Sequence, residues 1–126
     1  MSFWTRRNWL TLAALGGFLS VAFGAFAAHG VADPKAKEWL HTGALYGFMH
    51  SLAVFGCALL MDLGAKRARF APAFFVAGGV IFSGSLYAMA LGGPRILGAI
   101  TPIGGTLLLV GWLVLAWAAR GVDRQA

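Results

Sequence analysis

Residues 71–92 read APAFFVAGGVIFSGSLYAMALG, and none of these 22 positions carries a charged side chain. A helix rises about 1.5 Å per residue, so a run of this length can cross the roughly 30 Å hydrocarbon core of a bilayer. Within the run, FSGSLY at 82–87 places two serines, a glycine and a tyrosine among apolar neighbours. The stretch predicts a membrane-spanning helix with polar positions that water cannot satisfy.

Three more segments have a similar length and apolar character. Backbone polar groups in lipid must be paired internally, and these runs lack the alternating pattern of a β-barrel, so each segment is expected to be a helix. The predicted fold is all-α, a polytopic membrane protein with four transmembrane helices in an up-down bundle. Residues 1–126 are expected to form one domain, with spans at about 9–28, 43–63, 71–92 and 97–119.

The composition points away from a soluble protein. Of the 126 residues, 60% are hydrophobic and 11% are charged, and the mean hydropathy is +0.77. Soluble domains are about 45–50% apolar and about 25% charged. The net charge of +6 comes from basic residues beside the apolar segments, where Lys and Arg set topology and meet anionic lipid. We therefore expect the lipid bilayer as a partner, with neither nucleic acid nor a soluble substrate.

The basic residues are unequally divided between the two sides of the predicted membrane. Seven lie on one side, namely Arg6, Arg7, Lys66, Arg67, Arg69, Arg120 and Arg124. Three lie on the other, namely Lys35, Lys37 and Arg95. Because cytoplasmic loops carry the excess of Lys and Arg, both termini are expected in the cytoplasm and loops 29–42 and 93–96 outside.

The first outer loop, residues 29–42, carries a helix start signal of its own. Asp33 followed by Pro34 is typical of an N-cap and a first helical position. We expect a short interfacial helix in this loop, with Trp39 at headgroup depth. This helix could run straight into the second span, although Gly43 offers a place for the chain to bend before it.

Small residues recur about every fourth position in the spans. Helices in lipid associate by close packing, which small residues permit. The predicted packing positions are Gly16, Ser20 and Gly24 in the first span, Gly43 and Gly47 in the second, Gly84 in the third, and Gly104 and Gly105 in the fourth. The serines of FSGSLY fit the same interpretation, because their hydroxyls can bond to their own helix carbonyls.

The polar side chains of the spans fall at one predicted depth, in the outer third of the membrane. This candidate polar cluster comprises Tyr46, His50, Ser83, Ser85, Tyr87 and Thr101. His50 is the ionisable residue well inside a span, and such a residue is a functional candidate with a partner facing it. Its imidazole needs a hydrogen-bond partner, which Tyr87, Ser83 or Thr101 could supply.

Three roles for His50 remain open from the sequence. It could form a structural hydrogen bond between spans, handle a proton or ligand from outside, or ligate a metal or haem. Haem would need a second axial ligand, and zinc three or four ligands, which the spans do not offer. Ser83 or Ser85 beside His50 would be a nucleophile and base without an orienting third group. We therefore expect no enzyme, with no catalytic, cofactor-binding or metal-binding residues.

Thr101 and Pro102 interrupt the fourth predicted span. A proline inside a helix removes one hydrogen bond and displaces the carbonyl four residues earlier, here that of Gly98. The result could be a kink needed for packing, or a broken helix that forms an ion site. The second interpretation lacks a carboxylate within the membrane.

Several of these stretches resemble a family of small four-helix membrane proteins that is catalogued as a domain of unknown function and has a eukaryotic transmembrane relative. The matching stretches are AFAAHG (25–30), HTGALYGFMH (41–50), FSGSLYAMALGG (82–93), LGAITPIGG (97–105) and GW (111–112). The resemblance implies a bacterial inner-membrane location and no particular activity. Members tend to carry a polar residue before the tyrosine of the second span, where this chain has Leu45, and this departure weakens a proton-relay role for His50.

Two hypotheses for function follow from these features. The first is a non-enzymatic structural or accessory subunit of a larger inner-membrane complex, whose partners are other membrane subunits. Its surplus aromatic surface for partner helices or lipid is expected at Phe74, Phe75, Trp112 and Trp117. The alternative is a homo-oligomeric carrier or channel for a small solute or ion, with a site near His50.

Overall fold

The computed structural model describes residues 5–124, and this part of the chain is helical without a strand. Its elements are α1 (Arg6–His29), α2 (Pro34–Asp62), the 3-10 helix η1 (Lys66–Phe70), α3 (Ala71–Ala90), the 3-10 helix η2 (Arg95–Ala99) and α4 (Thr101–Ala119). In this described part, four helices are long and apolar enough to cross a membrane, the last two with the 3-10 turn that precedes each. The predicted all-α membrane fold is confirmed.

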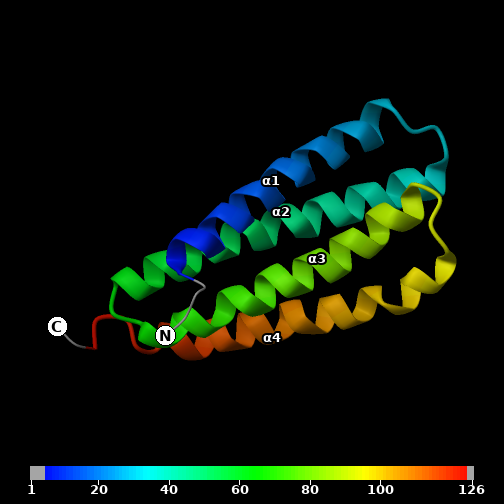
Figure 1. Cartoon of the computed structure of the whole chain (residues 1–126). Helices are drawn as coiled ribbons and strands as arrows, with labels where there is room; N and C mark the ends of the chain where they lie inside the picture. The colour runs from blue at the N-terminus through cyan, green and yellow to red at the C-terminus, as the bar shows by residue number, and fades with distance from the viewer. Residues whose placement is uncertain (1–4, 125–126) are drawn as a thin grey trace.

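The helices run alternately in opposite directions, and each packs against the next one along the chain (Figure 1). The α2–α3 pair is central, with α1 on one side and α4 on the other. Between residues 5 and 124, the backbones of α1 and α4 nowhere come close. The bundle is therefore open, and α1 approaches α3 over a short stretch only.

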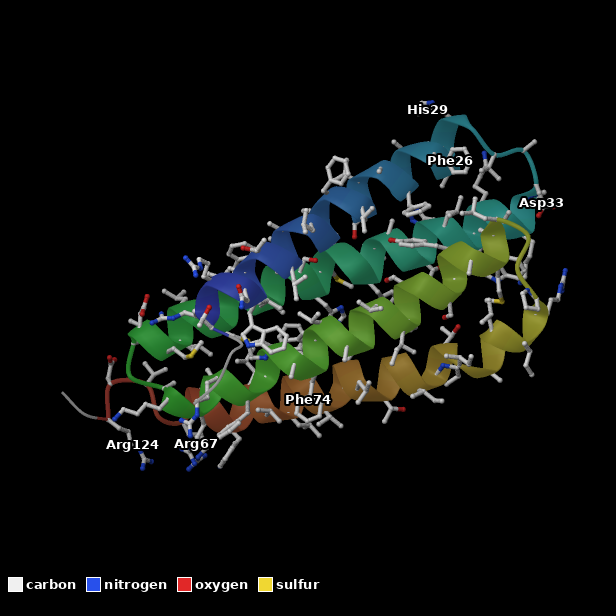
Figure 2. The ribbon with its side chains drawn as sticks, viewed as in Figure 1. Phe26, His29, Asp33, Arg67, Phe74 and Arg124 are labelled. Atoms are coloured by element: carbon white, nitrogen blue, oxygen red, sulfur yellow. The ribbon has the colours of Figure 1, made fainter. Side chains whose placement is uncertain are left out.

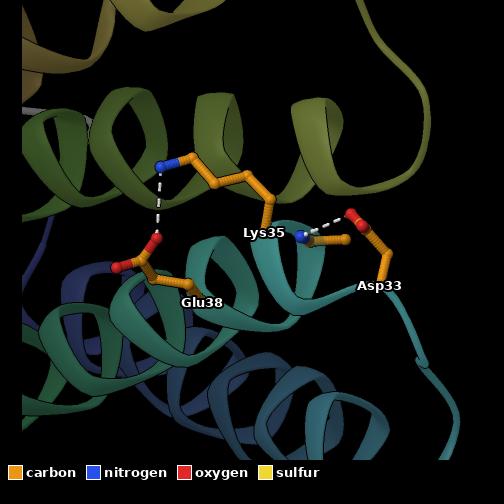
Figure 3. Close-up of polar contacts among 4 residues, drawn as sticks. Asp33, Lys35 and Glu38 are labelled. Atoms are coloured by element: carbon orange, nitrogen blue, oxygen red, sulfur yellow. Dashed lines mark hydrogen bonds and ion pairs between the residues drawn. The ribbon is translucent and has the colours of Figure 1, made fainter.

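The start of α2 follows the predicted capping pattern. Asp33 accepts a hydrogen bond at 3.0 Å from the backbone N–H of Ala36, and Pro34 occupies the first helical turn (Figure 3). One turn on, Lys35 and Glu38 form an ion pair at 3.2 Å (Figure 3). The local signal for a helix start in the outer loop is confirmed.

The predicted short interfacial helix is not a separate element. The helix that begins at Pro34 continues without a break through Gly43 to Asp62, a total of 29 residues. The physical reason is packing. Gly43 lies against the ring of Tyr87 in α3, so the missing side chain allows close contact between the helices and does not mark a bend. At about 1.5 Å per residue the helix is longer than the roughly 30 Å hydrocarbon core. Part of it must therefore extend beyond the hydrocarbon.

Pro102 lies in the first turn of α4 and not in the interior of a helix. This position corrects the predicted kink and the broken-helix alternative. The residues before it form η2, and α4 starts at Thr101 with Pro102 in its first turn. Proline fits there because the first turn needs no N–H from it. The Thr101 hydroxyl donates to the Leu97 carbonyl at 3.2 Å, which links η2 to α4.

Glycines allow the closest approaches between helices. At the α3–α4 crossing, a Cβ added to Gly104 would lie 2.8 Å from the Gly78 carbonyl oxygen and would collide with the backbone nitrogen of Phe82. Between α1 and α2, a Cβ on Gly16 would lie 2.7 Å from the Ser51 hydroxyl. Close packing of this kind replaces the hydrophobic effect as the attraction between helices in lipid.

The other predicted packing positions differ in how tightly they are enclosed. A Cβ on Gly24 would lie 3.6 Å from Ala44 Cβ, and one on Gly105 would lie 3.7 Å from the Phe82 ring, which are ordinary contacts. Gly84 is different, because an added Cβ would meet no atom within 4 Å. Gly84 lies on the outer face of α3 and does not pack against a helix of this chain.

The core lies between the helices and is small. Phe75 lies at the centre of this core and is 1% exposed. It is therefore not part of the surplus aromatic surface expected from the sequence. Around it pack other buried residues, namely Ala13, Ala53, Val54, Cys57, Ala71 and Leu108. Large apolar side chains such as Phe18 and Leu113 point outward, at 70% and 72% exposed, as expected for a lipid-facing surface.

We expect Gly104→Ala to destabilise the protein and Gly56→Ala to leave it unchanged or slightly stabilised. The first substitution forces backbone apart at the α3–α4 crossing, at a cost on the order of 1–3 kcal/mol. A Cβ on Gly56 meets no atom within 4 Å, and alanine is the better helix former. Thermal unfolding in detergent measures both. Equal midpoints for the two variants would contradict the close glycine contact.

Candidate functional site

His50 is buried between α2, α3 and α4, and both of its ring nitrogens have partners. Its Nδ1 lies 2.6 Å from the carbonyl oxygen of Tyr46, one turn earlier in α2. Its Nε2 lies 3.0 Å from the indole Nε1 of Trp112 in α4. An indole N–H can only donate, so Nε2 accepts and Nδ1 carries the proton that goes to the Tyr46 carbonyl. His50 is therefore a neutral imidazole that ties α2 to α4.

Aromatic rings enclose this histidine. The centroid of the His50 ring is 5.7 Å from that of Phe75, 5.9 Å from that of Trp112 and 6.2 Å from that of Tyr46. Phe75 and Trp112 also meet edge to face at 5.2 Å. Only 6% of His50 is exposed. His50 is thus a hydrogen-bonded polar group among packed rings, and it also forms part of the lining of the groove described below.

The predicted partners of His50 were wrong, because Trp112 holds it in place of Tyr87, Ser83 or Thr101. Trp112 belongs to the aromatic surface expected from the sequence, and its side chain is indeed 45% exposed. Its N–H nevertheless turns inward. The sequence held one signal for this pair, because an indole N–H in lipid needs an acceptor and a ring nitrogen of His50 can accept.

A second group of polar residues meets over Gly47 of α2. A Cβ added to Gly47 would lie 2.7 Å from the Ser20 hydroxyl, 3.1 Å from the Ser83 hydroxyl and 3.5 Å from the Tyr87 hydroxyl. Ser20 belongs to α1 and the other two residues to α3. Three helices thus converge where the residue at position 47 has no side chain.

Each serine hydroxyl in this second group is used within the protein. Ser20 donates to the Gly16 carbonyl of its own helix at 2.9 Å, and Ser83 donates to the Gly43 carbonyl of α2 at 2.7 Å. The Tyr87 ring stacks on Phe23 of α1 at a centroid distance of 4.0 Å. Ser83 and the Phe23–Tyr87 stack therefore join α3 to both α2 and α1.

A third group links α3 to the start of α4. The hydroxyls of Ser85 and Thr101 lie 2.5 Å apart, so one of them donates to the other. The accepting hydroxyl keeps its own proton for a backbone carbonyl, that of Phe82 at 3.0 Å for Ser85 or that of Leu97 at 3.2 Å for Thr101. The candidate polar cluster of six residues is thus three separate groups. The first group joins α2 to α4, the second α3 to α2, and the third α3 to the start of α4.

In the described chain, the two serines do not pair with His50, and the polar groups do not form a metal-binding cluster. The hydroxyls of Ser83 and Ser85 bond to other oxygens, and neither is hydrogen-bonded to His50. Across residues 5–124, no three side chains of the His, Cys, Asp and Glu types lie close enough to hold a metal ion. His29 at the end of α1 and His41 in the first part of α2 are both exposed. The chemistry available to this arrangement is hydrogen bonding between helices.

A groove separates α1 from α3, with α2 as its floor. Its volume is about 200 Å³, and it reaches Tyr87 of the Phe23–Tyr87 stack. We call it the α1–α3 groove, and residues that line it include Gly16, Leu19, Gly47, Gly79, Val80 and Gly84. Gly79 and Gly84 on the α3 side would each accept a Cβ without meeting another atom. The α1–α3 groove is thus a departure from close packing in the membrane-spanning part of the bundle.

Residues 23–105 match the protein family described as "Protein of unknown function (DUF423)". The chain is 44% identical over 117 residues to a "UPF0382 membrane protein" of Haemophilus influenzae, covering 90% of this chain and 94% of the relative. It is 40% identical over 125 residues to "UPF0382 inner membrane protein YgdD" of Escherichia coli K12, covering 96% and 95%. It is 39% identical over 116 residues to "UPF0382 membrane protein YwdK" of Bacillus subtilis, covering 87% and 94%. No solved structure matches the chain.

We expect Trp112→Phe to lower stability by about 1 kcal/mol, because it leaves the buried His50 Nε2 without its donor while keeping an aromatic ring. Adding His50→Leu to Trp112→Phe should cost less than the sum of the two single changes, since both partners are then removed. The matched control is Trp117→Phe, in the same helix and 48% exposed.

Thermal unfolding in detergent compares the three single variants with the double variant. Strict additivity, or an equal loss in Trp112→Phe and Trp117→Phe, would rule out the hydrogen bond as the link between α2 and α4.

Proposed function

The chain belongs to the family of bacterial membrane proteins described as DUF423, and we propose that it acts as a non-enzymatic structural or accessory subunit of a larger inner-membrane complex. The observation that carries this proposal is the α1–α3 groove, which faces out of the bundle and has a glycine, alanine or serine at half of its lining positions, among larger side chains. Small residues are what membrane helices use to approach one another closely.

The occupant that we propose for the α1–α3 groove is a transmembrane helix of another subunit. An apolar cavity of about 150 Å³ can hold benzene. The groove of about 200 Å³ therefore has room for one large apolar side chain of a partner helix. The bare α-carbons of Gly79 and Gly84 let that helix approach the α3 backbone. A side chain whose shape fits the groove makes more van der Waals contacts there than a mobile acyl chain of a lipid does.

The alternative function, a homo-oligomeric carrier or channel with a site near His50, has less support. A solute or proton site would need a ring nitrogen that is free to exchange partners. Here one nitrogen is held by the Tyr46 carbonyl and the other by Trp112. An intramembrane enzyme also has less support. Its nucleophile would need a hydrogen bond to His50, but Ser83 bonds to the Gly43 carbonyl and Ser85 to the Thr101 hydroxyl.

The experiment is affinity isolation of the tagged protein from native membranes in mild detergent, followed by mass spectrometry and a native mass measurement. The wild type should retain a fixed stoichiometry of a larger membrane protein. Gly79→Leu and Gly84→Leu should each release it, because their side chains start at a Cβ that meets no atom of this chain within 4 Å and extend into the α1–α3 groove. The matched control is Gly56→Leu, which is equally free of neighbours but lies outside the groove.

Two outcomes would contradict the proposed function. One is a homogeneous homo-oligomer of the wild type without a second protein, which would favour a carrier and direct the next assay to solute flux. The other is retention of the partner by the groove variants at the level of the Gly56→Leu control, which would place the interface elsewhere.

We also propose that both termini face the cytoplasm. Arg6 at the start of α1 pairs with Asp62 at the end of α2, and the Asp123 N–H donates to the Leu63 carbonyl at 3.0 Å, so the first and last described helical segments share one end. That end also carries most of the basic residues, which the positive-inside rule places in the cytoplasm.

A reporter fused to the C-terminus tests this orientation. Green fluorescent protein fused after residue 126 should fluoresce, whereas alkaline phosphatase at the same point should be inactive, because it folds only outside the cytoplasm. The reverse pattern should appear when the same reporters follow residue 93, truncating the chain between α3 and η2. An active phosphatase at the C-terminus would overturn the proposed topology.

A further inference from the structure

The end of the molecule that carries the two termini has a large surplus of positive charge. It holds seven basic and two acidic side chains, against three basic and two acidic at the opposite end. We call it the basic end, and its cations are Arg6, Arg7, Lys66, Arg67, Arg69, Arg120 and Arg124. Figure 2 shows Arg67 and Arg124 there, with His29 and Asp33 at the far end. Five of the six net positive charges of the chain therefore lie together.

Most of these cations have no carboxylate partner. Of the two acidic residues at this end, Asp62 is taken by Arg6 at 2.5 Å. Over residues 5–124, no ion pair reaches the cations of η1 or those that follow α4, namely Lys66, Arg67, Arg69, Arg120 and Arg124. Unpaired cations grouped at a membrane surface attract anionic headgroups.

Two arginines of η1 are held in place and not left to move freely. The Arg67 guanidinium lies 4.4 Å from the ring centroid of Trp117 at the end of α4, and Arg67 is half-buried. The Arg69 guanidinium lies 4.3 Å from the ring centroid of Phe70 and donates to the Lys66 carbonyl at 3.3 Å. An arginine fixed on an aromatic face loses less entropy when it binds an anion.

Trp117 also sets the depth of Arg67. Tryptophan rings favour the boundary between hydrocarbon and headgroups, and Trp117 is 48% exposed near the C-terminal end of α4. The turn that follows α4 closes over the same place, because Arg67 Nη2 lies 3.8 Å from where a Cβ of Gly121 would be. Arg67 is thus positioned at the level where lipid phosphates lie.

From these observations we propose that the basic end binds the phosphate of an anionic phospholipid, with Arg67 as its central contact. The planar guanidinium can donate two parallel hydrogen bonds to phosphate oxygens. Lys66 and Arg69 on η1, and Arg120 after α4, add charge around it. The lipid's acyl chains would then lie along the exposed apolar side of α4.

The opposite end supplies a matched control for this site. Arg95 also stacks on a tryptophan, with its guanidinium 5.6 Å from the centroid of the Trp39 ring, and it forms no ion pair in the described chain. Lys35 shares the same ring at 5.8 Å, but it is paired with Glu38. Arg95 therefore reproduces the stacked arginine without the surrounding surplus of charge.

Native mass spectrometry of the full chain in detergent tests the proposal, with phosphatidylglycerol and phosphatidylcholine of the same acyl chains as probes. The wild type should retain phosphatidylglycerol in preference. Arg67→Gln should weaken retention roughly fivefold, as expected for one cation near an anionic surface, and Arg67→Lys should lose less. Arg95→Gln should behave as the wild type does.

The exposed Arg120 gives a second variant that removes charge without removing packing, should Arg67→Gln fail to fold. Arg120→Gln should also weaken the retention of phosphatidylglycerol. Equal retention of the two lipids by the wild type would overturn the proposal, as would an equal effect of Arg95→Gln and Arg67→Gln. Displacement of the lipid by inorganic phosphate as readily as by free phosphatidylglycerol would show a site for free anions and not for lipid.

Discussion

The pairing of polar groups inside the membrane is the constraint on which this structure depends. Lipid offers no hydrogen bonds, so each hydroxyl, imidazole or indole within a span gains by finding a partner inside the chain. The bond from Trp112 to His50 joins the outer helix α4 to α2, and the bond from Ser83 to Gly43 joins α3 to α2. These bonds fix how each helix is rotated about its axis.

Glycine contacts then set how close the helices come. The carbonyl of Gly78 sits where a side chain at position 104 would be, so α3 and α4 meet backbone to backbone. Where α1 and α3 diverge, the same kind of residue is left uncovered, as at Gly79 and Gly84. Glycine therefore has two effects in this bundle. It allows close contact between α3 and α4 in the interior, and it leaves a recess on the outside between α1 and α3.

The two ends of the bundle differ strongly in net charge. The end with η1 collects arginines that lie on the rings of Trp117 and Phe70, while the end with the α1–α2 loop pairs Lys35 with Glu38. Aromatic rings and cations at the membrane surface hold a small helical protein at a fixed depth. The proposed subunit role and the proposed lipid site thus occupy different parts of the molecule, one on its side and one at its end.

The sequence by itself determined the four spans and the Asp33–Pro34 start of α2, because hydropathy and capping depend on residues that are neighbours along the chain. Only the tertiary structure decided which polar groups meet. His50 and Trp112 are 62 positions apart, and their bond depends on the rotation of two helices relative to each other. The same rotation buries Gly47 under three hydroxyls and leaves Gly84 open, although both are glycines in apolar spans.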